Sequence, residues 1–156
     1  DNEDRMPAKF LTLDASARNL YRALSNNETV GIAFDGRIGS KFVKVPYLGR
    51  EALLNPGPFR LAQSTGAAIV PAFCTAPASH KNVLQFGSPI YPAAKGKKGS
   101  WKDLMERFLS DKIEPLIRQN PAEYGLWLAH CRMRASIDDH PFFIDYAPDD
   151  RYLKYV

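Results

Sequence analysis

Residues 30–40 read Val30-Gly31-Ile32-Ala33-Phe34-Asp35-Gly36-Arg37-Ile38-Gly39-Ser40. The first half is apolar and β-branched, which is typical of a buried strand, and the second half is a turn that begins with a carboxylate. Ligands of α/β proteins bind at the ends of such strands. An acid, an arginine and two glycines there indicate a turn whose backbone and guanidinium meet an anionic group. Asp-Gly is also a common turn pair, so a tight loop with solvated charges is the alternative.

Length and composition favour an ordinary soluble globular protein. The chain has 156 residues, 45% hydrophobic and 24% charged, which suits one domain over residues 1–156 with a sizeable core. The net charge of +4 does not indicate nucleic acid and gives only a slight preference for phosphates or a lipid surface. Two cysteines cannot build a disulfide framework, which favours a reducing compartment. No stretch is apolar enough to span a bilayer, and none reads as a signal peptide.

Periodicity predicts the elements around the opening stretch. Apolar residues recur at helical spacing over residues 13–24, and a polar run then leads into a strand over residues 29–34. Residues 41–45 alternate between apolar and charged side chains, which predicts a half-exposed strand. Pro46 is expected to end this strand, because proline cannot donate to a sheet.

After the strand at residues 41–45, the middle of the chain predicts a helix and two further strands. A short helix opens in Asn55-Pro56-Gly57-Pro58 and continues through Gln63, and Gly66 is suited to its end. Residues 67–75 read as a buried strand, with Cys74 as a small core residue. Residues 82–87 read as another short strand. The order favours a βαβ unit, so the predicted class is α/β, with a mixed sheet flanked by helices.

The strongest helix signal begins at Ser100. Asp103, three residues later, completes a capping-box pattern. Pro115 is expected to kink or shorten the last turn. One face stays apolar throughout, which favours core packing over a membrane-lying surface. The residues of this face are Trp101, Leu104, Met105, Phe108, Leu109, Ile113, Leu116 and Ile117.

The chain has few residues or motifs of the kinds that usually catalyse a reaction or bind a metal. The histidines His80, His130 and His140 have no metal-ligand partners at a recognisable spacing, so no metal site is predicted. Cys131 follows His130 directly and would point to the opposite face of an extended chain. The lysines in residues 93–99 read as part of a solvated loop, with binding of a phosphate or lipid headgroup as the alternative. The chain contains no P-loop, no G-x-S-x-G and no G-x-G-x-x-G.

Several segments, in order, resemble a known family. Phe34 to Arg37, followed by Ser40, resembles the acid-Gly-x-Arg block of the lysophospholipid acyltransferase superfamily. Residues 61–71 resemble that superfamily's helix, Gly-Ala turn and strand ending in Val-Pro. The similarity is closer to the bacterial lipid A late acyltransferases. It rests on the Val-Pro-Tyr-Leu-Gly of residues 45–49 and on a closing block, Pro-x-Glu-Tyr then Trp-Leu-x-His, within residues 121–132.

This resemblance implies transfer of a fatty acyl chain from a thioester to a hydroxyl of a membrane lipid. The implied donor is an acyl-carrier protein or coenzyme A thioester, with no bound cofactor. The implied place is the cytoplasmic side of the inner membrane, either peripheral or through a missing N-terminal anchor. In the family, a histidine in an H-x4-Asp/Glu motif is the general base that activates the hydroxyl. No histidine here has an acid five positions later in the family's context. The chain therefore resembles the C-terminal portion of a three-layer acyltransferase, and it is expected to be inactive alone.

The resemblance also assigns site residues. Asp35 matches the family's functional acid, and Arg5 lies about where the family has an important arginine. Arg37 would face a phosphate or carboxylate, where its fork of donors suits planar anions better than lysine. The structural alternative for Asp35 is a carboxylate that caps its own turn.

Four further residues complete the predicted substrate-binding set. Gly36 and Gly39 would let the backbone approach the substrate closely. Ser40 belongs to the same block, and Asn55 stands where closer relatives have a Thr-rich patch. Two other function classes stay open: a non-catalytic lipid- or anion-binding module on the same fold, and a small hydrolase-like domain, which the missing nucleophile elbow disfavours.

Overall fold

The computed structural model describes residues 8, 17–35, 41–75, 82–94, 99–124 and 142–143. They fall into two compact units, residues 1–31 and residues 32–156. The described part of the first unit contains α1 (Ala17–Ser25). Its last turn closes through the Asn26 N–H, which donates to the carbonyl of Arg22 at 2.9 Å, and Asn27 then adopts a φ of 61°. The predicted helix and its polar end are confirmed within the described range.

The strand predicted over residues 29–34 is wrong. These residues form no β-ladder with any segment that the structure describes, and Ile32 is 45% exposed. A strand must exchange hydrogen bonds with a neighbour. The strands of the second unit find their partners locally instead, as two hairpins. The apolar composition of residues 30–34 was compatible with a strand, but it did not specify a partner.

The first hairpin joins β1 (Val43–Tyr47) to β2 (Arg50–Leu54). Leu48 and Gly49 form its two-residue turn with φ values of 54° and 81°, and the turn pairs Tyr47 with Arg50. Positive φ at both central residues is the type I′ arrangement that matches strand twist. The half-exposed strand is confirmed, since its residues alternate between buried and exposed.

Pro46 does not end β1, contrary to the sequence expectation. It lies within the strand, opposite Glu51. Residues that flank a two-residue turn exchange hydrogen bonds, and the next pair along the ladder does not. Pro46 occupies that next position, so its missing N–H leaves no hydrogen bond of the hairpin unmade.

After β2, α2 (Gly57–Thr65) begins and ends where expected. Pro56 and Pro58 stand at its start. Gly66 ends it in the left-handed region, with a φ of 76°, and donates its N–H to the Ala62 carbonyl at 2.8 Å.

The second hairpin joins β3 (Ala72–Thr75) to β4 (Val83–Phe86) in antiparallel order. The strand predicted over residues 67–75 is therefore shorter than expected. Cys74 is exposed, not a core residue. The βαβ interpretation is also wrong for the described strands, because α2 connects one hairpin to another and not two parallel strands of one sheet.

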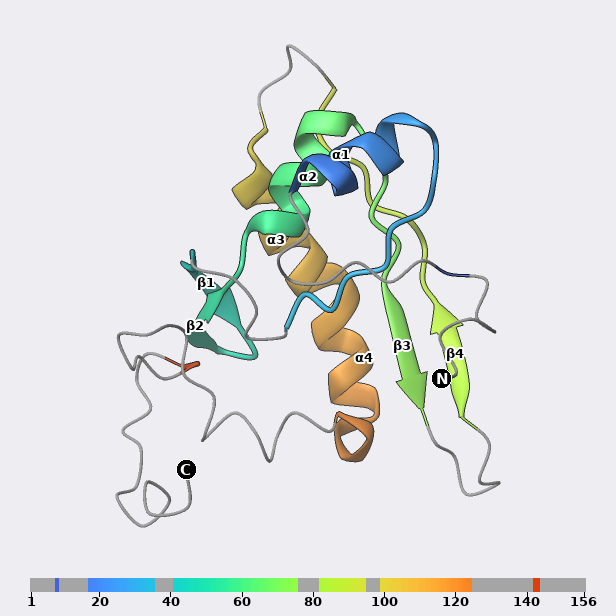
Figure 1. Ribbon diagram of the computed structural model, residues 1–156. Coiled ribbons are helices and arrows are strands. Elements are labelled where there is room, and N and C mark those ends of the chain that lie inside the picture. The colour runs from blue at the N-terminus through green and yellow to red at the C-terminus, as the bar shows by residue number, and fades with distance from the viewer. Residues whose placement is uncertain are drawn as a thin grey trace, which may run out of the picture. The chain divides into compact units, whose positions relative to one another are not determined.

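The helix predicted from Ser100 forms α3 (Trp101–Phe108), a π-helical turn η2 (Leu109–Ile113) and α4 (Glu114–Gln119), followed by the short turn η3 (Pro121–Glu123). Figure 1 shows α3 continuing into α4 as one rod. Within η2, the Glu114 N–H bonds to the Leu109 carbonyl, five residues back. Pro115 lacks an N–H, and its ring crowds the carbonyl four residues earlier. A widened turn just before it accommodates the ring, and the helix continues to Gln119.

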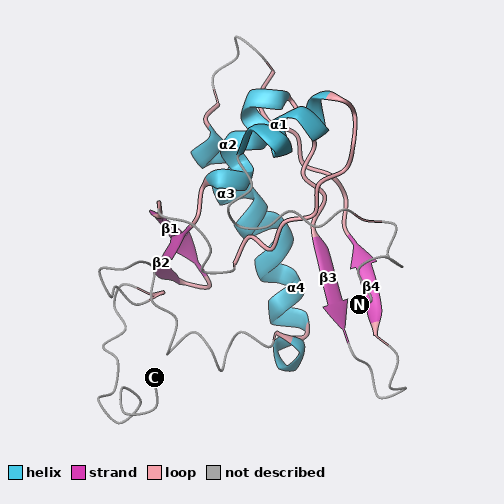
Figure 2. Cartoon of the chain, in the orientation of Figure 1, coloured by secondary structure: helices cyan, strands magenta, loops and turns pink. Residues whose placement is uncertain are grey.

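The apolar face of this rod forms much of the core, as predicted. The rod contributes Leu104, Met105, Phe108, Leu109, Ile113 and Ile117, and the first hairpin and α2 contribute Val45, Tyr47, Ala52, Leu54, Phe59 and Ala62. Figure 2 shows the helices and the two small antiparallel sheets. The predicted α/β class is confirmed.

The capping box at Ser100 gives the first testable prediction. Its hydroxyl accepts from the Asp103 N–H at 3.1 Å, and its own N–H donates to Asp103 Oδ2 at 2.7 Å. Ser100→Ala should lower the free energy of unfolding by about 1 kcal/mol, measured by urea denaturation. Ser110→Ala is the control, because Ser110 lies inside the rod with its hydroxyl on the adjacent Asp111 side chain. An equal loss in both variants would contradict the capping role.

This penalty should also depend on pH. Hydrogen bonds from the backbone and hydroxyl of Ser100 lower the pKa of the Asp103 carboxyl. A lowered pKa contributes stability that is present above the unfolded-state pKa and is lost as pH falls through the folded-state value. We therefore expect the difference between wild type and Ser100→Ala to shrink in acid.

Candidate functional site

Asp35 is one of the two sequence-predicted site residues that the structure describes, and it is half-buried. The residue before it fixes its position. The Phe34 ring meets the ring of Phe108, on α3, edge to face with centroids 5.3 Å apart. Phe108 in turn contacts Phe59 of α2 at 5.4 Å. The segment that carries the carboxylate is thus anchored to the core through an aromatic contact.

Two buried tyrosines lie next to this carboxylate. The Tyr124 hydroxyl donates to Asp35 Oδ2 at 3.3 Å, across 89 positions of sequence. The Tyr47 hydroxyl lies 3.0 Å from the Tyr124 hydroxyl. A phenol carries one proton, and Tyr124 uses it on Asp35, so Tyr47 must be the donor in the contact between the two hydroxyls. The hydrogen bonds therefore run in one direction, from Tyr47 through Tyr124 to Asp35. We call these three residues the tyrosine–aspartate chain.

Rigid elements hold the start of this chain. Tyr47 is the last residue of β1 and is 0% exposed. Its ring stacks against that of Phe143 at 6.5 Å. The next residue, Leu48, donates its N–H to Glu114 Oε1 at 2.9 Å, which ties the hairpin turn to the start of α4. Glu114 also pairs with Arg118 at 3.3 Å.

Burial dominates the electrostatics of the tyrosine–aspartate chain. It raises the pKa of the Asp35 carboxyl, and hydrogen bonds from its own backbone N–H and from Tyr124 oppose part of that rise. Burial also raises the pKa of both tyrosines. The negative charge of Asp35 raises them further, and Glu114 adds to the effect at Tyr47. Both hydroxyls therefore stay protonated at neutral pH and remain hydrogen-bond donors.

Asn55 is the second described residue of the predicted set. Its Oδ1 accepts the Gly57 N–H at 2.8 Å, just before α2. This contact belongs to the start of the helix, as asparagine commonly makes there. The structure thus shows a local structural contact for Asn55. Arg5, Gly36, Arg37, Gly39 and Ser40 lie outside the described residues.

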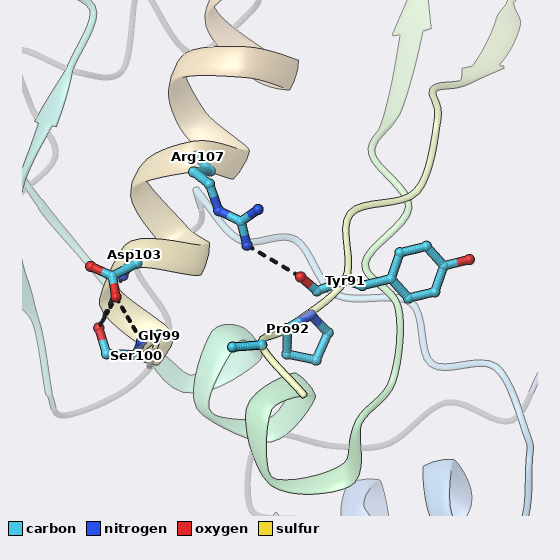
Figure 3. Close-up of a pocket in the computed structure, with 7 residues that line it drawn as sticks. Tyr91, Pro92, Gly99, Ser100, Asp103 and Arg107 are labelled. Atoms are coloured by element: carbon cyan, nitrogen blue, oxygen red, sulfur yellow. Dashed lines mark hydrogen bonds between the residues drawn. The ribbon is translucent and has the colours of Figure 1, made fainter. Parts of the chain in front are cut away.

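A separate open cavity of about 400 Å³ lies between residues 91–93 and the start of α3. Figure 3 shows hydrogen bonds that involve its two charged side chains, Arg107 and Asp103. Arg107 Nη2 donates to the Tyr91 carbonyl at 3.2 Å, and Asp103 completes the capping box with Ser100. The Tyr91 ring points away from Arg107 (Figure 3). This cavity has no lining residue in common with the tyrosine–aspartate chain, so we do not regard it as the reaction site.

The described ranges hold no group of three histidine, cysteine or acidic side chains placed to bind a metal ion. Within the same ranges, no helix has both the length and the apolar composition to cross a membrane. What the described site offers is a carboxylate held by a neutral phenol. Such a group can accept a proton or orient a hydroxyl or a cationic side chain.

Sequence reasoning did not assign roles to Tyr47, Tyr124 or Glu114. Both tyrosines were within segments that carried the family resemblance, at residues 45–49 and 121–132. A usable signal was present, because a tyrosine in a core segment needs a partner for its hydroxyl. The sequence could not show that the partner of Tyr124 is Asp35, 89 positions away.

Comparison with known proteins supports the resemblance. Residues 2–134 match the family model described as bacterial lipid A biosynthesis acyltransferase. This range includes all three residues of the tyrosine–aspartate chain. Comparison with curated proteins and with solved structures gave no match.

Proposed function

Because this chain belongs to the bacterial lipid A biosynthesis acyltransferase family, whose members transfer acyl groups in lipid biosynthesis, we propose that it forms the C-terminal part of an enzyme that acylates a membrane lipid. The donor is a fatty acyl thioester on acyl-carrier protein or coenzyme A, and the acceptor is a lipid hydroxyl. The reaction uses no other cofactor. The family match over residues 2–134 is the observation that carries this proposal.

Of the predicted site residues, Asp35 is the one whose contacts most support a role in the reaction. It follows the anchored Phe34 and accepts from Tyr124, and it lies in the block that resembles the family's functional acid. A half-buried carboxylate is costly to keep charged unless it is paired or hydrogen-bonded, as Asp35 is to Tyr124. In the proposed enzyme, Asp35 orients the acceptor hydroxyl or a basic neighbour, Arg37 binds an anionic group of the substrates, and Arg5 is a second catalytic residue.

The general base of the proposed reaction is a histidine of an H-x4-Asp/Glu motif on the N-terminal side of Asp35. Alcohol attack on a thioester needs such a base, because a neutral hydroxyl is a poor nucleophile. One histidine of this chain has an acid five positions later, His140 with Asp145, but it follows Asp35 in sequence, whereas the family's motif precedes the acid block. We therefore assign the base to a residue upstream of this chain, and we expect the chain alone to be inactive.

The substrates define where the reaction takes place. A lipid acceptor is presented at a membrane surface, and thioester donors are made in the cytoplasm. The enzyme accordingly works on the cytoplasmic side of the inner membrane, attached peripherally or through an N-terminal anchor. The net charge of +4 is compatible with an anionic lipid surface. Nucleic acid is not a partner in this proposal.

Transfer of radiolabelled acyl groups tests the proposal directly. The complete product of the gene, including any sequence upstream of Asp1, is mixed with acyl-carrier-protein or coenzyme A thioesters and membrane lipids, and lipid products are separated. We expect a labelled lipid, loss of the product when the upstream H-x4-Asp/Glu histidine is replaced, and little change with His140→Ala. A complete protein that lacks such a motif and transfers no acyl group would leave the alternative, a binding module on the same fold. Loss of the product with His140→Ala would move the general base to His140.

A further inference from the structure

We propose that Tyr124, supported by Tyr47, is a positioning residue that holds the Asp35 carboxylate in the orientation needed for acyl transfer. This inference rests on the proposed function. It gives a role to the closing block of the family resemblance, residues 121–132, whose Tyr124 lies beside the acid of the first block. Tyr124 acts through Asp35 and does not itself contact the reacting atoms.

The direction of the hydrogen bonds indicates that Tyr124 orients Asp35, and that Asp35 is more than a hydrogen-bond partner for a buried hydroxyl. A hydroxyl that needed only a partner could donate to any nearby carbonyl. Tyr124 instead donates to a carboxylate oxygen, and Tyr47 occupies its acceptor side at 3.0 Å. With both hydrogen-bonding functions of the phenol engaged, the Asp35 side chain is restricted to the rotamers that keep Oδ2 near Tyr124. The other carboxylate oxygen is then presented in a defined direction.

The anchors of the two tyrosines are rigid. Tyr124 is 6% exposed and follows η3, at the end of the long helical rod. Tyr47 is 0% exposed and ends β1. Glu114 ties the adjacent turn to α4 through Leu48. A helix end and a strand end thus converge on the loop that carries Asp35, and functional groups held on such elements are positioned more precisely than groups held by a loop alone.

The described titratable groups around Asp35 define the expected pH dependence. Tyr124 contacts Asp35 directly. Tyr47, at the end of β1, interacts electrostatically with Asp35 and with Glu114, at the start of α4. The positive charge of Arg118 is engaged by Glu114. Removal of the Tyr124 hydroxyl takes away a hydrogen bond that favours the charged carboxylate, so the pKa of Asp35 should rise.

Tyr124→Phe tests this inference in the complete, active protein. We expect kcat to fall by up to about a hundredfold with the KM for the donor unchanged, because a misdirected catalytic group impairs the chemical step more than binding. The acidic limb of the pH profile should move to higher pH. Tyr47→Phe should lower kcat and move the acidic limb in the same direction but by less, since Tyr124 keeps its bond to Asp35. Tyr91→Phe is the matched control, because Tyr91 is 62% exposed, and it should change neither.

A second measurement does not depend on activity. The Asp35 carboxyl can be titrated by ¹³C NMR in wild type, Tyr124→Phe and Tyr91→Phe. An upward shift in Tyr124→Phe only is the expected result. If Tyr124→Phe does not fold, Tyr47→Phe decides by the same titration. An Asp35 variant that retains full activity would refute the catalytic role while the titration still reports the contact. If Asp35 is essential but Tyr124→Phe changes neither the pKa of Asp35 nor the pH profile, only the positioning role of Tyr124 would be refuted.

Discussion

Asp35→Asn is expected to lower acyl transfer by about a hundredfold to ten-thousandfold and at the same time to stabilise the protein at neutral pH. Asparagine keeps the size of the side chain and an oxygen that can accept from Tyr124, but it removes the charge. Burial raises the pKa of the Asp35 carboxyl, which means that the fold disfavours its ionised form. Removing a charge that the fold disfavours should therefore cost function and not stability.

The sign of the stability change follows from proton linkage. A carboxyl with a raised pKa binds its proton more tightly in the folded state, so its contribution is favourable below the unfolded-state pKa and is lost as pH rises through the folded-state pKa. Asp35→Asn should be more stable than wild type at pH 7, and the two should converge as pH falls below the ordinary aspartate pKa. Urea denaturation at several pH values measures this difference.

The same experiment separates the two interpretations of Asp35 that the sequence left open. A carboxylate that mainly caps its turn would contribute to folding, so its replacement would destabilise the protein at neutral pH. Asp103 provides an internal comparison, because its pKa is lowered by the capping box at Ser100. Destabilisation by Asp35→Asn at pH 7, with activity retained, would favour the capping role.

Phe108→Ala is expected to cost about 3–5 kcal/mol of stability. Phe108 is 4% exposed, and its ring contacts the rings of both Phe34 and Phe59. Its removal leaves a cavity between α2 and α3 and frees the residue that precedes Asp35. The loss is comparable with the whole stability of a marginal domain. Because Phe34, the residue before Asp35, loses its ring contact in this variant, activity should fall even at temperatures where the variant remains folded.

Phe86→Ala is the matched control for this variant. It removes the same side chain from β4, where Phe86 is 68% exposed. The free energy of unfolding should change by no more than about 0.5 kcal/mol. Both variants can be followed by urea denaturation with circular dichroism as the signal. Similar losses at the two positions would contradict the placement of Phe108 at the centre of the aromatic contacts.

Local signals predicted much of the fold correctly. The capping box at Ser100, the proline-rich start and glycine end of α2, and the alternating residues of β1 each depend on neighbours within a few positions. Failures arose where the outcome depends on distant partners. The apolar run at residues 29–34 pairs with none of the described strands, and β3 and β4 pair with each other instead of forming a parallel unit.

Pro46 shows a second kind of failure, in which the proline rule was correct but its predicted consequence, the end of the strand, was not. Pro46 lies at a ladder position that requires no N–H donor, and Pro115 is accommodated by the π-helical turn before it. Position in the ladder and the freedom of the preceding turn are properties of the folded chain. A single sequence does not reveal them.

The candidate site was only partly predictable. The sequence identified Asp35 because an acid at a glycine-rich turn is a recognisable pattern. It could not identify the hydrogen bonds from Tyr47 and Tyr124, since these depend on the packing of β1 against the end of the helical rod. Asn55, also in the predicted substrate-binding set, contacts the start of α2 through its side chain.

A double-mutant cycle between Asp35→Asn and Tyr124→Phe tests the central claim most directly. The quantity to measure is the rate of acyl transfer to lipid by the complete protein in all four combinations. If Tyr124 acts through Asp35, Tyr124→Phe should slow the wild-type enzyme but cause no further loss in the Asp35→Asn background. Equal factors in both backgrounds would show that the two residues act independently, and would contradict the account.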